Sequence, residues 1–267
     1  MSLHKFSIMI RLGVSGVKGS GKDYFGSVVS AGLDSREYRL SFAQPVHDIC
    51  RVLDSNYDKR TERGRRLAQL IGTEVGRGEV HINIDQQVGL LEEIRSLKTQ
   101  VLAQAARQIP YLSLVEFNDM LGTKDLWINL FKARYRAILS QVVGSELKAN
   151  TYITCCDVRF ENEFRMLKEL GFTLAYVAAP IEQIMGVTQR EQSAFTNSHV
   201  SESINGRLYE ELVTNGKKSA EAEKAVGLEG VGFDLLIWND RYGHAEVPSD
   251  QFLLLEKGKE YVNAHNY

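Results

Sequence analysis

The stretch "GVSGVKGSGKDYFG", residues 13–26, decides the fold expected of this chain. Within it, the spacing Gly16-x-x-x-x-Gly21-Lys22 is typical of a loop that cradles phosphate with backbone N–H groups and one lysine. The mostly apolar run "SIMIRLGV" (7–14) stops just before this loop and predicts a buried parallel strand, and a helix is expected to begin at Gly21. A strand, a glycine-rich turn and a helix start are together the context in which this motif binds phosphate.

The loop would present consecutive N–H groups and a helix N-terminus to the β- and γ-phosphates of ATP, while the Lys22 ammonium would follow the transferred group. Lys18 lies inside the loop, and its side chain is expected to be solvated. A glycine-rich turn without a ligand is the alternative interpretation. The expected ATP-binding residues are Gly16, Val17, Lys18, Gly19, Ser20, Gly21, Lys22 and Asp23.

The residue after the loop lysine is Asp23, where the usual motif has a Ser or Thr whose hydroxyl binds Mg²⁺. A carboxylate in the first turn of a helix gains only about 0.3 to 1 kcal/mol from the helix dipole. At a separation of about 4 Å from a phosphate oxygen, it is repelled by roughly 4 kcal/mol if the effective dielectric constant is about 20. A cation between the two reverses the sign, so we expect Asp23 to hold Mg²⁺ directly or through its water shell.

The composition limits the kinds of partner. The chain has 267 residues, with 32 Lys and Arg against 34 Asp and Glu, so a net charge of -2 gives no general reason to expect binding to polymeric nucleic acid or to an anionic membrane. No apolar run approaches the roughly 20 residues that span a bilayer. The three cysteines, Cys50, Cys155 and Cys156, lack zinc-type spacing and are expected to be free thiols of a soluble cytoplasmic protein.

Four more strands are expected along the chain, each followed by a helical pattern or a turn. Because strands alternate with helices, they predict an α/β fold with a doubly wound parallel sheet of about five strands, and a ligand at the carboxyl ends of the strands. The four segments are "YRLSFA" (38–43), "TYITCCDVR" (151–159), "FTLAYVAAP" (172–180) and "FDLLIWND" (233–240).

The whole chain, 1–267, is expected to form one domain with two inserted segments. Segment 78–124 contains an amphipathic helical stripe, interpreted as a helix packed on the main body, with a homodimer contact or a moving cover as alternatives. Segment 205–229 is polar and punctuated by glycine, so it is expected to be a surface excursion.

Two further groups of side chains could take part in chemistry. Asp157 and Arg159 leave the third strand two residues apart and hence on one face. Asp157 could hold Mg²⁺ or receive a proton from an acceptor hydroxyl, and Arg159 could clamp a phosphate, unless the two form only a salt bridge. Arg190 could add positive charge from a mobile cover. The stretch "SHVSES" (198–203) lacks a nucleophile elbow, so no hydrolytic triad is expected.

The segment "RRLAQLIGTEVGR" spaces Arg66, Gln69 and Thr73 three and four residues apart, which places them along one helical face. The carboxamide of Gln69 has both a donor and an acceptor and could read a nucleobase edge. A merely solvated helix face is the alternative.

Taken together, these segments resemble the deoxynucleoside monophosphate kinases of tailed bacteriophages, which belong to the P-loop nucleoside monophosphate kinase fold. Asp23 after the loop lysine is itself part of that family pattern. Two features depart from it: Tyr24 stands where a small hydroxyl residue is expected, and the connection between Thr73 and Trp127 is longer. The resemblance covers nearly the whole chain and rests, in order, on "SGVKGSGKD", "RRLAQLIGTE", "LWINLF", "DVRFENE", "HVSE" and "FDLLIWND".

The resemblance implies a P-loop NTPase-type α/β/α fold and direct transfer of phosphate from ATP to a deoxynucleoside 5′-monophosphate, with Mg²⁺, in the cytoplasm of a host cell. It implies three sets of residues: Lys22, Asp23, Asp157 and Arg159 in catalysis; Arg66, Gln69, Thr73 and Arg159 in the monophosphate pocket; and Asp23 at the metal. The alternatives are another small-molecule P-loop kinase, such as a dephospho-coenzyme A kinase, and an ATPase or nucleotide-dependent switch without a kinase product.

Overall fold

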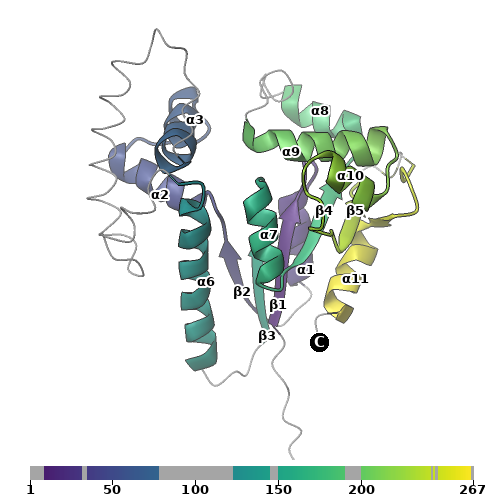
Figure 1. Ribbon diagram of the computed structural model, residues 1–267, viewed down its shortest axis with the longest axis horizontal. Coiled ribbons are helices and arrows are strands. Elements are labelled where there is room, and N and C mark those ends of the chain that lie inside the picture. The colour runs from purple at the N-terminus through teal and green to yellow at the C-terminus, as the bar shows by residue number, and fades with distance from the viewer. Residues whose placement is uncertain are drawn as a thin grey trace, which may run out of the picture. The chain divides into compact units, whose positions relative to one another are not determined.

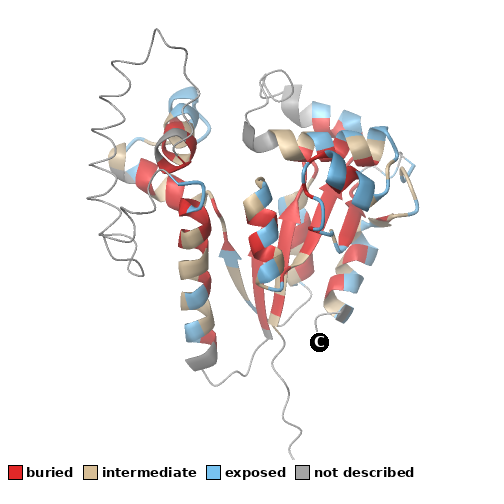
Figure 2. Cartoon of the chain, viewed as in Figure 1, coloured by how far each residue is buried: buried red, intermediate tan, exposed pale blue. Residues whose placement is uncertain are grey.

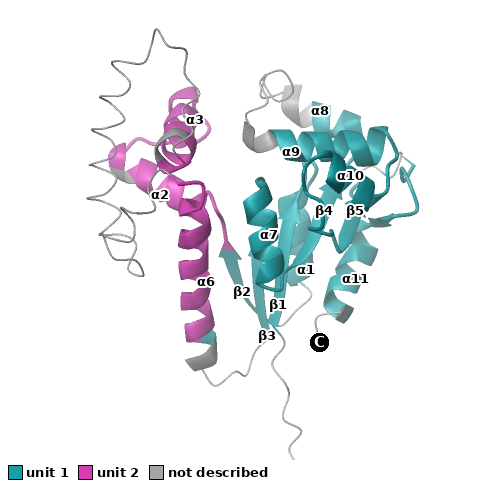
Figure 3. Cartoon of the chain, viewed as in Figure 1, with its two compact units in different colours: residues 1–39, 142–267 teal, residues 40–141 magenta. Residues whose placement is uncertain are grey.

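The computed structural model describes residues 9–31, 35–77, 123–144, 150–189, 200–241, 243 and 246–265. The chain divides into two compact units (Figure 3). Unit 1 comprises Met1–Arg39 and Val142–Tyr267, and unit 2 comprises Leu40–Gln141. Segment 78–124, with the helix expected in it, lies outside the described residues apart from its last two positions, 123 and 124.

Unit 1 is built on a parallel sheet, as the sequence predicts (Figure 1). The strand order is β2-β3-β1-β4-β5-β6; β1 pairs in parallel with β3 and β4, and the parallel ladder continues through β5 to β6. Six strands are present rather than about five, because the three-residue β6 is too short to show a sequence period. The strands are β1 Met9–Ser15, β2 Ser35–Leu40, β3 Asn150–Cys155, β4 Thr173–Ala178, β5 Leu235–Trp238 and β6 Phe252–Leu254.

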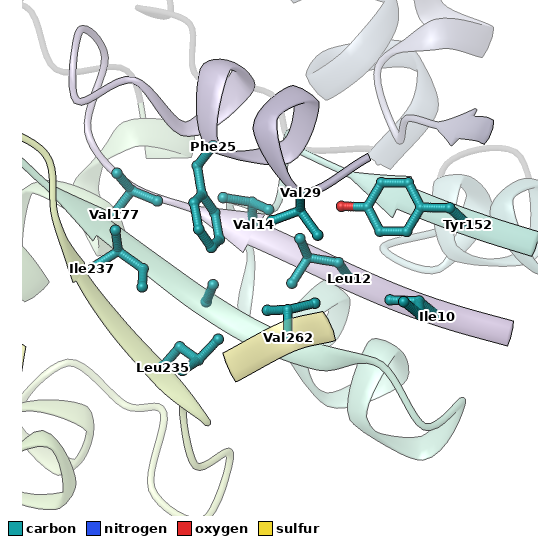
Figure 4. Close-up of a cluster of buried hydrophobic side chains, with 11 residues drawn as sticks. Ile10, Leu12, Val14, Phe25, Val29, Tyr152, Val177, Leu235, Ile237 and Val262 are labelled. Carbon is teal, nitrogen blue, oxygen red and sulfur yellow. The ribbon is translucent and has the colours of Figure 1, made fainter. Parts of the chain in front are cut away.

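Helices lie on both faces of this sheet and complete a three-layer α/β/α architecture. One face of β1 carries Ile10, Leu12 and Val14, which pack with Phe25 of α1 and Val262 of α11 (Figure 4). The helices of this unit are α1 Lys22–Ala31, α7 Glu161–Glu169, α8 Ile181–Gln189, α9 Val200–Tyr209, the π-helical η3 Glu210–Thr214, α10 Ser219–Ala225 and α11 Leu255–His265.

The alternate residues of β1 face the other helical layer, as the two-residue period of a strand requires. Arg11 donates from Nη1 to the carbonyl oxygen at the end of α7, at 3.4 Å. Gly13 leaves room for α7, since a Cβ atom there would lie 2.9 Å from Leu167 Cδ1. Ser15, the last residue of β1, donates from Oγ to Asn205 Oδ1 of α9 at 2.6 Å.

Segment 205–229, expected to be a surface excursion, is mostly helical, and some of its residues are buried (Figure 2). Leu208 and Leu212 are fully buried, and the Tyr209 hydroxyl donates to the carbonyl oxygen of Ala179 at 2.9 Å. The buried carboxylate of Glu223 accepts hydrogen bonds from two backbone N–H groups. Because the carboxylate of Glu223 has these partners, most of the cost of burying it is removed.

Unit 2 is helical: α2 Gln44–Leu53, α3 Glu62–Gln69, the π-helical η1 Leu70–Val75, and α6 Leu126–Gly144 up to residue 141. Thr61 caps α3, because its hydroxyl accepts the N–H of Gly64 at 3.0 Å. Trp127 donates from Nε1 to the carbonyl oxygen of Gly72 at 2.7 Å, which joins α6 to η1. No helix of the described ranges is long and apolar enough to cross a membrane. The core consists of Val46, Ile49, Cys50, Leu70, Ile71, Leu126, Trp127 and Leu130.

Candidate active site

The glycine-rich loop lies at the carboxyl end of β1, between β3 and β4. This is the point at which the strand order changes direction, where open α/β sheets bind their ligands. Gly16, Gly19 and Gly21 have φ angles of 150°, 87° and 89°. Residues with a Cβ rarely adopt such angles, so the three glycines are what allow the chain to fold back into a phosphate-sized cradle.

The loop also makes close contacts with the backbone of β4 and with a side chain at the end of β5. A Cβ atom on Gly16 would lie 2.3 Å from the carbonyl oxygen of Val177, and one on Gly21 would lie 2.1 Å from Asn239 Nδ2. Asn239 follows β5, and its Nδ2 donates to the carbonyl oxygen of Ser20 at 2.8 Å. Its own N–H donates to the carbonyl oxygen of Ala178 at 2.9 Å. These contacts hold the loop against the ends of β4 and β5.

The inside of the loop holds a buried polar group without a partner. Ser20 Oγ is fully buried and lies 2.7 Å from the position of a Cβ atom on Gly16. No described residue forms a hydrogen bond with this oxygen. Buried polar groups are normally satisfied, and the exceptions commonly indicate a missing water or ion. The positive φ angles and this hydroxyl together fit a loop that is completed by a bound anion.

Electrostatics around Cys156 show which charged groups converge beside the loop. Burial, first of all, and the negative charges of Asp23 and Asp157 together raise the pKa of the Cys156 thiol to about 12. Lys22 opposes this effect, so its ammonium also lies within electrostatic range of the thiol. Asp23 and Lys22 of α1 and Asp157 after β3 thus lie within electrostatic range of the same thiol.

The position of Cys156 explains this convergence. A Cβ atom on Gly26 would lie 2.7 Å from Cys156 Sγ, and Gly26 is one helical turn beyond Lys22 on α1. The small glycine therefore lets the end of β3 approach the first turns of α1. All three cysteines are free thiols, as predicted.

Arg39, at the end of β2, is a cation of this region that the sequence did not indicate. Its Nη2 donates to Ser27 Oγ of α1 at 3.0 Å. Its pKa is raised first by the hydrogen bond to Glu37, with the thiol of Cys156 and the carboxylate of Asp23 also contributing. An exposed arginine on a strand has no distinctive sequence pattern, so only the fold could show that it is near Asp23.

The loop that carries Asp157 and Arg159 is fixed by several hydrogen bonds. The buried carboxylate of Glu163, in the first turn of α7, accepts the N–H of Arg159 at 2.8 Å and that of Phe160 at 3.1 Å. On the other side, the Cys155 thiol donates to Asp157 Oδ1 at 3.2 Å. Arg159 is therefore held by its backbone, and its guanidinium group extends from a rigid base.

A second arginine lies beside the phosphate loop. Arg241 Nη2 is 4.0 Å from the position of a Cβ atom on Gly21, and the Arg241 N–H donates to Gln183 Oε1 of α8 at 3.1 Å. Asn239 and Arg241 were missed by sequence reasoning. The sequence feature that could have indicated them is the polar stretch directly after the fifth apolar strand, at the edge of the sheet where ligands are expected.

Three of the four residues predicted for the monophosphate pocket belong to unit 2, whereas Arg159 belongs to unit 1. Arg66 is exposed and Gln69 is half-buried on α3, whereas Thr73 is 7% exposed within the π-helical η1. A π-helical turn contains more residues than an α-helical turn, so the three-and-four spacing does not continue unchanged from Gln69 to Thr73. Short π-helical segments are frequent at functional sites. Arg190 lies outside the described residues.

The donor set around Cys156 suits a magnesium–nucleotide site. Mg²⁺ is usually held by one or two carboxylates together with substrate phosphates and water. Asp23 and Asp157 supply two carboxylates, and no group of three or more His, Cys, Asp or Glu that could hold a metal exists within the described ranges. This arrangement therefore fits Mg²⁺ that binds together with the phosphates of a nucleotide.

The comparisons with known proteins find no relative of this chain. Neither a scan of the sequence against models of protein families nor a search among curated proteins finds a match. The functional conclusion therefore rests on the geometry of the site and on the sequence motifs.

Proposed function

We propose that this protein transfers the γ-phosphoryl group of ATP to a deoxynucleoside 5′-monophosphate. The observation that carries the proposal is the convergence of Lys22, Asp23 and Asp157 around Cys156, beside a glycine cradle. A phosphate loop alone would support any ATP-binding role. A carboxylate on the neighbouring strand end adds a group that can act on an acceptor. The acceptor class itself comes from the resemblance of the sequence motifs.

In the proposed mechanism, the backbone N–H groups of the loop and the start of α1 hold the β- and γ-phosphates, and Lys22 neutralises charge on the transferred group. When bound, Mg²⁺ would be held by Asp23 and would offset the charge of the phosphate oxygens. Asp157 would help to hold Mg²⁺ or would accept a proton from the acceptor, and Arg159 clamps the acceptor phosphate. Transfer is in line and direct, so the chain needs no covalent intermediate.

The acceptor contacts in this proposal come from Arg66, Gln69, Thr73 and Arg159. The guanidinium groups suit a phosphate, and the half-buried carboxamide of Gln69 suits a base edge. Arg190 is proposed to add positive charge from a cover. ATP and the monophosphate are the proposed partners in the cytoplasm, with no polymeric nucleic acid.

A coupled assay of ADP release tests the proposal. ATP and Mg²⁺ are combined with dGMP, dTMP, dCMP, dAMP or their ribose counterparts, and the nucleotides are separated by chromatography. A deoxynucleoside diphosphate formed in step with ADP is the expected result. ADP without a phosphorylated acceptor would favour an ATPase or switch. Turnover only with dephospho-coenzyme A would favour the other small-molecule kinase.

A further inference from the structure

Asn205 of α9 connects two segments of the site through its side chain. Its Oδ1 accepts a hydrogen bond from Ser15 Oγ at 2.6 Å, and its Nδ2 donates to the carbonyl oxygen of Val158 at 3.2 Å. Ser15 directly precedes the first glycine of the phosphate loop. Val158 stands between Asp157 and Arg159. One carboxamide therefore touches both the phosphate loop strand and the loop with the predicted acceptor residues.

The three groups form a closed arrangement in the interior. Ser15 Oγ also lies 3.1 Å from the carbonyl oxygen of Val158, and Ser15, Val158 and Asn205 are each 1% exposed. The carbonyl oxygen of Asn205 accepts a hydrogen bond from the buried Tyr176 hydroxyl at 2.8 Å, so the residue is also held by its backbone. The cluster is thus shielded from bulk solvent.

The sheet itself does not fix the separation of these two segments. The ladder between β1 and β3 ends at the pair Gly13 and Cys155. Beyond that pair, no hydrogen bond between these two strands sets the separation of the segments that follow them. Ser15 and Val158 lie past the end of the ladder. The hydrogen bonds of Asn205 replace the ladder where the two segments diverge.

We infer that Asn205 is a positioning residue, which fixes the distance between the phosphate loop and the Asp157 to Arg159 loop. The inference rests on the proposed function. In a direct phosphoryl transfer the rate depends on holding two phosphates in line, and a misplacement of about 1 Å can reduce the rate by about 100-fold. Asn205 itself touches no reacting group.

Anchoring of α9 alone would not require Asn205. The Tyr209 hydroxyl, one turn later, also makes a buried hydrogen bond to the sheet, to the carbonyl oxygen of Ala179 at 2.9 Å. That bond involves neither Ser15 nor Val158. Tyr209→Phe is therefore a matched control, because it removes a buried hydrogen bond from the same helix without altering the proposed linkage.

The test uses the full chain with Asn205→Ala, Ser15→Ala, the double variant and Tyr209→Phe. For Asn205→Ala we expect kcat to fall by about 10- to 100-fold, while KM for ATP stays within about two-fold. Ser15→Ala should lower kcat in the same direction, and the double variant should fall less than the product of the two single effects. Tyr209→Phe should keep the wild-type kcat. Equal kcat values in Asn205→Ala and Tyr209→Phe would overturn the inference.

Hydrogen exchange supplies a readout that does not depend on turnover. In Asn205→Ala, or in the milder Ser15→Ala if the first variant folds poorly, peptides covering residues 13–21 and 156–160 should exchange faster than in wild type and in Tyr209→Phe. Unchanged exchange in both segments would also refute the linkage. A wild-type protein without any phosphoryl transfer would refute the proposed function instead, and the exchange data would then decide the linkage separately.

Discussion

Asn239 Nδ2 donates a 2.8 Å hydrogen bond to the carbonyl oxygen of Ser20, and the same nitrogen occupies the space that a side chain on Gly21 would need. The end of β5 thus supports the phosphate loop from outside. Because Gly21 also has a φ angle of 89°, this position combines a backbone requirement with a packing requirement.

Gly21→Ala is expected to weaken ATP binding by at least about 10-fold, because the methyl group would displace Asn239 and strain the backbone. Calorimetric titration with ATP measures this change. The control is Gly206→Ala in α9, where a Cβ atom would meet nothing within 4 Å. That variant should keep the ATP affinity and stabilise the protein by about 0.5 to 1 kcal/mol. Normal ATP affinity in Gly21→Ala would show that phosphate binds elsewhere.

Lys22→Ala is expected to abolish phosphoryl transfer, with a loss of at least about 100-fold in kcat, since it removes a positive charge that neutralises the transferred group. Product formation is followed by chromatography. Lys224→Ala removes the same charge from the exposed face of α10 and should leave the rate unchanged. Equal rates in the two variants would refute the assignment of Lys22.

Asp23→Ala is expected to raise the Mg²⁺ concentration that gives half-maximal rate, because a charged oxygen ligand is lost. Rates are measured over a Mg²⁺ series at fixed ATP. Asp250→Asn, which removes an exposed carboxylate outside the site, should leave the Mg²⁺ dependence unchanged. A wild-type Mg²⁺ dependence in Asp23→Ala would contradict a metal-binding role.

The sequence could predict features that depend on local pattern. Four of the longer strands and the loop from Gly16 to Lys22 were predicted because apolar runs and glycine spacing are local signals. The strand expected at 38–43 lies at Ser35–Leu40 instead, because its polar residues give no clear signal of where it begins. Contacts between distant segments could not be found in this way. Ser15 and Asn205 are 190 positions apart, and nothing in either segment alone indicates that they meet. The same holds for Asn239, whose partner Ser20 is 219 positions away.

In unit 2, Gly76 lies against the indole of Trp127, and a Cβ atom there would be 2.3 Å from the ring. Gly76→Ala is therefore expected to lower the free energy of unfolding by about 1 to 3 kcal/mol through overpacking. Gly72→Ala is the control, since its Cβ atom would lie 3.5 Å from Val46, an ordinary contact. Urea unfolding measures both. A Gly76→Ala protein as stable as Gly72→Ala would show that the ring can move aside.

Cys156 reports the charges around the site through its own ionisation. With a pKa of about 12, the native thiol ionises far less at pH 9 than a free thiol, so alkylation of Cys156 should be slow in the folded protein. Asp23→Asn removes one of the carboxylates that raise this pKa and should speed up alkylation at a given pH. Asp250→Asn should not. The rates follow from mass spectrometry of the peptide that contains Cys156, over a series of pH values.

The same raised pKa also makes a prediction about stability. The folded state holds the Cys156 proton more tightly than the unfolded chain, whose thiol has a pKa of about 9.0. The unfolded state therefore loses its proton first as pH rises, so the contribution of this thiol to stability is complete below about pH 9 and is lost as pH rises toward 12. Cys156→Ser should reduce this alkaline loss of unfolding free energy, measured by urea unfolding at each pH. A Cys156→Ser protein with the same alkaline loss as wild type would mean that the thiol ionises as easily in the folded state as in the unfolded one, and hence that burial and the neighbouring carboxylates do not raise its pKa.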